Sequence, residues 1–206
     1  VRANPQGETA PEIWMLGSSL YGAQVAAHFG LPYSFAWFFT EGQGGPEAIQ
    51  IYRDRYQPSE RFPEPNPGIC VWALAAETHE EAQYHYTSRA RWQLYRDRGM
   101  HLTFESPEDA LAHSYNEREE ARIAELRKTS FVGTGEEVMT RTRELAERVG
   151  VDEVAIVTWA HSEQARRDSY SEMQQDNRRR RSNARRRRRS RRYHHHPAAL
   201  RAISYS

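Results

Sequence analysis

A short loop of small residues, Gly17-Ser18-Ser19, is the part of this sequence best suited to bind an anion. It lies between an apolar run, Ile13 to Leu16, and a helical pattern from about Tyr21 to Phe29. Two hydroxyls and free backbone N–H groups at a helix N-terminus favour a negatively charged group, most naturally a phosphate. A serine in this place is also an ordinary N-cap. The loop alone leaves both interpretations open.

The elements around this loop alternate between strands and helices. Four apolar runs predict strands of a parallel sheet; they cover 13–16, 31–39, 69–76 and 154–159. Helical patterns with capping signals predict helices over 21–29, 47–56, 78–98, 116–126, 134–149 and 162–173, whereas 130–135 predicts a loop. This order indicates parallel β/α architecture with right-handed crossovers, and four such units could form half of an eight-stranded barrel.

The charge is distributed very unevenly along the chain. Residues 178–206 contain twelve arginines and no acidic residue, while the rest holds 17 of the 29 basic residues and all 28 acidic ones, a net charge of −11. We therefore predict a folded region over 1–176 and a low-complexity, disordered Arg-rich tail over 177–206. The tail has two interpretations: a frame-shifted or mispredicted C-terminus, or an arm that binds nucleic acid or another anionic surface.

Other residues exclude several kinds of site. The single cysteine, Cys70, lies in an apolar run and predicts a buried small side chain rather than a disulfide. The histidines at 79, 85, 101 and 113 lack the mutual spacing of zinc ligands, so no metal is expected. No apolar stretch reaches about 18 residues and no signal peptide is evident, so we expect no membrane partner and a cytoplasmic location.

Several stretches, taken in order, resemble the bacterial-luciferase-like flavin monooxygenases. They are Trp14-Met-Leu-Gly-Ser-Ser19, Ala26-Ala-His-Phe-Gly-Leu-Pro32, Tyr52-Arg-Asp-Arg-Tyr-Gln-Pro-Ser59, Ala75-Ala-Glu-Thr-His-Glu-Glu-Ala82, Phe131-Val-Gly-Thr-Gly-Glu-Glu-Val138, Gly150-Val-Asp-Glu-Val154 and Arg166-Arg-Asp-Ser-Tyr170. Each motif alone is weak, and the resemblance depends on their order and spacing over residues 11–173.

The resemblance implies a fold and a set of site residues. It implies a partial (β/α)8 TIM barrel, in which the strands ending at Gly17, Phe39, Ala76 and Ala160 correspond to strands five to eight. The flavin phosphate would lie at the loop after the first of these, on Gly17, Ser18 and Ser19, with Tyr21 and Gly22 as neighbours. Trp37, Phe39 and His161 would line the flavin or substrate pocket. The aromatic segment Trp37–Phe39 stands where the family often carries histidines, and no residue is identified as a catalytic acid, base or nucleophile.

The activity that the resemblance implies is oxygenation of a small organic substrate by reduced FMN and O2, with the deazaflavin F420 as the alternative cofactor. A flavin reductase and a second copy of the chain are the protein partners that it suggests. Because the family's first four strands are absent from the sequence, we expect this piece alone to be inactive and aggregation-prone. The alternative function is a non-enzymatic remnant whose basic tail binds nucleic acid or anionic surfaces.

Overall fold

The computed structural model describes the backbone of residues 11–190 and the side chains of residues 11–180. Five parallel strands form its sheet; they are β1 (Met15–Gly17), β2 (Tyr33–Ala36), β3 (Pro67–Ala76), β4 (Phe131–Thr134) and β5 (Glu153–Val157). The helices are α1 (Leu20–His28), α2 (Trp37–Thr40), α3 (Gly45–Arg55), α4 (His79–Asp97), α5 (Pro107–Ala112), α6 (Glu117–Thr129), α7 (Gly135–Val149) and α8 (Glu163–Ser190). The predicted α/β class with a parallel sheet is confirmed.

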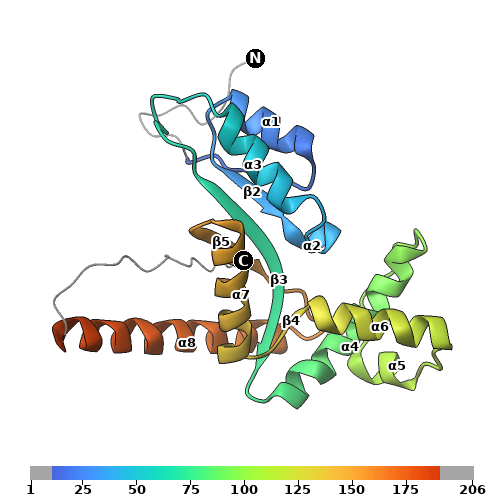
Figure 1. Cartoon of the computed structure of the whole chain (residues 1–206). Helices are drawn as coiled ribbons and strands as arrows, with labels where there is room; N and C mark the ends of the chain where they lie inside the picture. The colour runs from blue at the N-terminus through green and yellow to red at the C-terminus, as the bar shows by residue number, and fades with distance from the viewer. Residues whose placement is uncertain (1–10, 191–206) are drawn as a thin grey trace.

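The long strand β3 is the centre of the sheet (Figure 1). Residues 67–70 of β3 pair with β2, residues 68–72 pair with β5, and residues 73–76 pair with β4, while β1 pairs with β2. Because every pairing is parallel, all five strands run in the same direction, but their carboxyl ends are staggered along β3. β2 ends level with Cys70 and β5 with Trp72, whereas β4 begins level with Ala73 and ends level with Ala76. The segments that follow β1 and β2 are therefore neighbours, since Gly17 pairs with Phe35.

Two apolar clusters cover the two faces of β3. One face, which carries Ile69 and Val71, packs with α1, α3, α7 and α8. The other face, which carries Trp72 and Leu74, packs with α4 and α6. Figure 1 shows α7 on one side of β3 and the α4–α6 group on the other. This burial on both faces explains why 69–76 is a continuous apolar run rather than an alternating one.

Most predicted helix starts are confirmed by their caps. The hydroxyl of Thr78 accepts a hydrogen bond from Glu81 N at the start of α4. Capping boxes begin α6 at Asn116 and α7 at Thr134. Gly150 ends α7 in the left-handed conformation, at φ 71°.

The predicted strand over 31–39 is too long, because the chain turns into helix α2 directly after Ala36. The turn depends on a close approach of backbone to the Trp37 indole. A Cβ atom added at Gly42 would lie 2.2 Å from that ring, and Gly42 has φ +87°. Apolarity alone did not reveal this turn, since Trp37–Phe39 are as apolar as the strand before them.

The predicted loop over 130–135 contains a strand instead. Phe131 and Val132 are buried and pair with Ala73 and Leu74 of β3. The strand is only four residues long and contains Gly133 at φ 153°, so its local pattern is that of a loop. These residues form a strand rather than a loop because they pair with β3.

The last helix continues well beyond the predicted end at Met173. The backbone is helical to Ser190, so the prediction of a disordered tail from Asn177 is wrong over 177–190. Asp176 accepts hydrogen bonds from Arg143 of α7 at 2.8 Å and from Arg180 at 3.1 Å, which fixes this turn against α7. Arginine also has a high helix propensity. The rest of the predicted tail, 191–206, lies outside the described residues.

We predict that Gly42→Ala destabilises the protein more than Gly44→Ala. Both glycines have positive φ, so each substitution costs about 1 kcal/mol for backbone strain. A Cβ at Gly44 meets nothing within 4 Å, whereas a Cβ at Gly42 meets the Trp37 ring and adds about 1–3 kcal/mol of overpacking. Urea unfolding followed by tryptophan fluorescence measures both variants. Equal free energies of unfolding would contradict the close approach at Trp37.

Candidate active site

The loop after β1 is exposed and begins α1. Ser18 and Ser19 are exposed, and the Tyr21 side chain is 75% exposed. The Ser19 hydroxyl accepts a hydrogen bond from Gly22 N at 3.3 Å, so the N-cap interpretation of Ser19 is confirmed. The anion-binding interpretation does not require Ser19 to give up this role, because Ser18 lies beside the same exposed helix start.

Two glycines bring the loop and the helix close together. A Cβ added at Gly17 would lie 3.5 Å from the Cα of Gly22. The Tyr33 hydroxyl, from the adjacent strand β2, donates a hydrogen bond to the Gly17 carbonyl oxygen at 3.2 Å. Burial raises the pKa of Tyr33 to about 12, so its hydroxyl keeps its proton at neutral pH. Tyr33 therefore holds the loop from beneath and leaves its outer side exposed.

The first turn of α1 contains no acidic residue. Every other described helix of six or more residues carries Glu or Asp there, as the first turns of α4, α6 and α7 illustrate. Acidic side chains at a helix N-terminus compensate the positive end of the helix dipole. The positive end of α1 lacks this internal compensation, which makes it the helix start best suited to an external anion.

The loop after β1 shares an edge with the aromatic segment after β2. Gly17 pairs with Phe35 in the parallel register, so Ser18 and Trp37 both follow directly from that pair of strands. This arrangement is the one expected for a ligand site at the carboxyl ends of parallel strands.

A narrow pocket of about 60 Å³ lies between the end of β2, the middle of β3 at Trp72 and the start of β4 at Phe131. Trp37 and Phe39, two of the predicted pocket residues, line it together with Phe38, Trp72 and Tyr86. Polar groups reach it from α4 and from the end of α6 and include Arg89, Gln93, Thr129 and Ser130. The pocket thus combines apolar walls with a few polar groups, as ligand pockets do.

His161, the third predicted pocket residue, is exposed and is not among the residues that line this pocket. Trp159, two residues earlier, instead faces this side of the sheet and packs edge-on against Phe38 at 5.3 Å between ring centroids. Cys70 is buried, as predicted, and burial raises the pKa of its thiol to about 12, so it is a packing residue and not a nucleophile at neutral pH.

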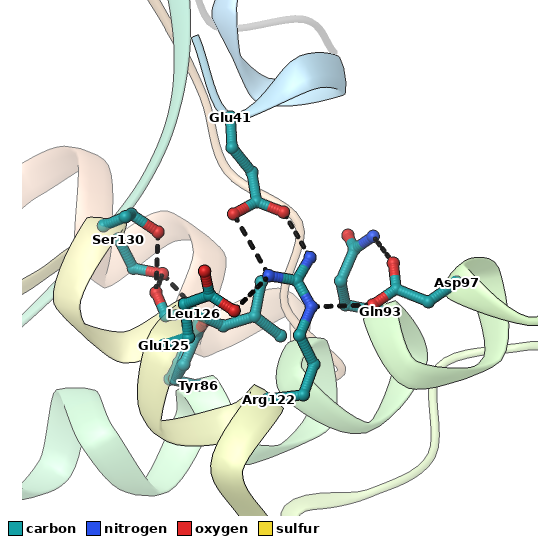
Figure 2. Close-up of polar contacts among 9 residues, drawn as sticks. Glu41, Tyr86, Gln93, Asp97, Arg122, Glu125, Leu126 and Ser130 are labelled. Atoms are coloured by element: carbon teal, nitrogen blue, oxygen red, sulfur yellow. Dashed lines mark hydrogen bonds and ion pairs between the residues drawn. The ribbon is translucent and has the colours of Figure 1, made fainter. Parts of the chain in front are cut away.

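Arg122 joins three segments beside the pocket (Figure 2). Its Nε donates to Asp97 of α4 at 2.8 Å, its Nη1 donates to Glu125 at 3.3 Å, and its guanidinium also contacts the carboxylate of Glu41, which follows α2. The bond to Glu41 raises the pKa of Arg122. Glu41 is held at φ 53°, an uncommon conformation for a residue other than glycine. Arg122 therefore fixes α4 and α6 to the segment that carries the aromatic pocket residues.

Sequence reasoning missed both Arg122 and Arg89. Arg122 meets Glu41 across 81 residues of chain, and no local pattern marks such a pair. Arg89 lies in a helix with many charged residues, where a solvated side chain is the ordinary expectation. Its buried position could be suspected only from the aromatic residues that flank it at helical spacing, Tyr86 and Trp92.

A model of the luciferase-like monooxygenases matches residues 1–153. The chain belongs to this family. The resemblance inferred from the sequence motifs is thereby confirmed, and with it the assignment to a monooxygenase, and hence oxidoreductase, family.

Individual family members agree with this assignment. The chain is 33% identical to YwcH of Bacillus subtilis over 174 residues, which cover 84% of this chain and 52% of that protein. It is 29% identical to a luciferase-like monooxygenase of Escherichia coli strain K12, over 80% of this chain and 48% of the relative. The crystal structure of apo-MsnO8 superimposes with a TM-score of 0.70 at 27% identity, over 82% of this chain and 51% of that one. The chain spans about half the length of the curated relatives it matches.

No helix within the described residues has the length and apolar character of a membrane span.

We predict that Arg122→Met lowers the free energy of unfolding by about 1–3 kcal/mol, because three carboxylates lose their shared partner in a partly buried setting. Arg167→Met is the matched control, since its ion pair with Glu163 is largely exposed and is worth at most about 0.5 kcal/mol. Urea unfolding of both variants tests the difference. Similar losses in the two variants would show that the Arg122 contacts are only surface pairs.

Proposed function

We propose that this chain carries the flavin phosphate site of a flavin-dependent monooxygenase that oxygenates a small organic substrate. Reduced FMN is the proposed cofactor, F420 is the alternative, and O2 is the co-substrate. The observation that carries the proposal is the exposed Ser18–Ser19 loop at the start of α1, a helix without first-turn acids, at the same sheet edge as the aromatic pocket. Family membership supports the same class of activity.

The residues of the loop suit a phosphate in three respects. The helix start is exposed, the neighbouring glycines leave the backbone accessible, and no acidic side chain in the first turn repels an anion. Ser18 offers a hydroxyl donor, and the backbone N–H groups of the first turn of α1 offer further donors. In this assignment Gly17, Ser18, Ser19, Tyr21 and Gly22 form the phosphate site.

The sheet supports the finer proposal of a partial barrel. We assign β1, β2, β3 and β5 to strands five to eight of a (β/α)8 barrel, because they pair in this order and all run parallel. Leu16, in β1, is 52% exposed, and Ile13 just before it is 60% exposed, which suits an edge that pairs with a further strand. The stretch that matches covers only 52% and 48% of the two relatives compared above, which leaves room in them for the other half of a barrel.

The chain's own residues bind and shield rather than react. A bound reduced flavin would supply the electrons that activate O2. Trp37, Phe38 and Phe39 provide apolar walls beside the proposed phosphate loop, and the network of Arg122 holds α4 and α6 against them, which limits the access of water.

A comparison of FMN with riboflavin tests the phosphate site. Riboflavin lacks the phosphate, so we predict that the protein binds FMN at least about tenfold more tightly, a preference of about 1.4 kcal/mol. Ser18→Asp places a negative charge beside the phosphate and should abolish this preference. Ser114→Asp is the control, because Ser114 is an exposed serine that precedes the capped helix α6.

Flavin fluorescence quenching measures the affinity of each of the three proteins for FMN and for riboflavin. Equal binding of FMN and riboflavin by the unmodified protein, or an unchanged FMN affinity in Ser18→Asp, would contradict the assignment of the loop.

A further inference from the structure

Arg89 lies in a cage of three tryptophans. Its guanidinium carbon is 4.3 Å from the ring centroid of Trp72 in β3, 5.1 Å from that of Trp159 after β5, and 5.5 Å from that of Trp92 in α4. The residue is only 8% exposed. Arginine stacks well on indole faces, and such contacts are worth up to about 2 kcal/mol when desolvated. The indole rings therefore cover the planar faces of the guanidinium. Its N–H groups point outward in the plane of the guanidinium and can still donate hydrogen bonds there.

The N–H donors at the edge of the Arg89 guanidinium have no hydrogen-bond acceptor among the described residues. Its Nη1 is fully buried and has no hydrogen-bond partner among them. Burial lowers the pKa of Arg89 to about 10, so the side chain is still charged at neutral pH. Glu41 acts on this charge electrostatically, but its carboxylate is engaged by Arg122. A buried charge without a hydrogen-bonded counter-ion costs several kcal/mol, which exceeds what the indoles return.

The neighbouring Arg91 shows how this chain normally compensates a buried arginine. Arg91 is also 8% exposed and also stacks on aromatic rings, those of Tyr95 and Tyr115. Unlike Arg89, it has a carboxylate partner, because its Nε donates to Glu105 at 3.2 Å. Two buried arginines of one helix thus differ in one respect: within the described residues, only Arg91 is hydrogen-bonded to an acid.

Arg89 also lines the pocket between the end of β2, the middle of β3 and the start of β4. Trp72 lines the same pocket, and its Nε1 is a second buried donor without a partner in the described part of the chain. The pocket volume is about 60 Å³. Since one water molecule needs about 10–15 Å³ on this measure, the pocket accepts a group of a few heavy atoms. A planar carboxylate has this size and matches the edge of a guanidinium.

We propose that Arg89, with Trp72, binds the carboxylate of an organic acid and that the substrate belongs to this class. The Trp cage orients the guanidinium, Nη1 donates to one carboxylate oxygen, and the rest of the ligand extends from the pocket towards Phe38 and Phe39. The inference rests on the proposed function for the role of the ligand as substrate. The binding step itself involves no flavin.

The test uses hexanoate and the uncharged hexanamide as probes, at constant ionic strength and without flavin. Three tryptophans surround Arg89, so their fluorescence should report occupancy. We expect saturable hexanoate binding at least about tenfold tighter than hexanamide binding, a difference of about 1.4 kcal/mol. Arg89→Met should remove this preference, Arg89→Lys should retain part of it, and Trp72→Phe should weaken hexanoate binding while keeping an aromatic face.

Arg96→Met is the matched control. The Arg96 guanidinium also stacks on Trp92, at 5.4 Å, but the residue is only partly buried. This variant should bind hexanoate like the unmodified protein. The free energy of unfolding of Arg89→Met is the second readout, because replacing an uncompensated buried charge by a similar apolar group is neutral or stabilising.

Three results would overturn the inference. The unmodified protein could bind hexanoate no better than hexanamide, or Arg89→Met could keep the preference for the carboxylate. A large loss of stability in Arg89→Met, with no hexanoate binding by the unmodified protein, would mean that a carboxylate of the protein itself satisfies Arg89. None of these results bears on FMN binding, and a failure of FMN binding would leave the hexanoate preference intact.

Discussion

Strand β3 is buried on both of its faces, and this burial organises the strands and helices around it. Its backbone pairs with β2, β4 and β5, and its side chains alternate between two separate apolar clusters. All these partners run parallel to β3, and β1 and β2 end side by side near the middle of it. The loop after β1 and the aromatic residues of α2 follow from these two ends, and the aromatic residues line the pocket with Trp72. A polar residue at Val71 or Leu74 would break a cluster and the alignment of the site together.

The same constraint explains which parts of the fold could be predicted from the sequence. The run from Ile69 to Ala76 is typical of a strand covered on both faces, and Thr78, Thr134 and Gly150 mark helix ends by their own chemistry. The start of α2 could not be predicted, because it depends on contact between Gly42 and the Trp37 ring rather than on local propensity. The strand at Phe131 was missed for a related reason. Four residues with a glycine become a strand only because β3 offers them a partner.

The candidate site likewise has one part that could be predicted from the sequence and one part that could not. The loop that we propose for the phosphate was identified from residue types at consecutive positions, since Gly17, Ser18 and Ser19 lie together in the chain. The cluster at Arg89 could not, because Trp72, Trp92 and Trp159 come from three elements and meet only in the folded protein. The role predicted for His161 stays a prediction. It follows the last strand and is exposed, while Trp159 packs against Phe38.

We propose that the exposed start of α1 binds the phosphate end of a flavin. Amide chemical shifts of the isotope-labelled protein, in parallel titrations with FMN and riboflavin, decide whether it does. FMN should shift the backbone N–H resonances of Ser18, Ser19 and Tyr21, whereas riboflavin should leave them largely in place. If FMN shifts resonances elsewhere and leaves these unmoved, the loop is an ordinary helix cap and does not bind the phosphate.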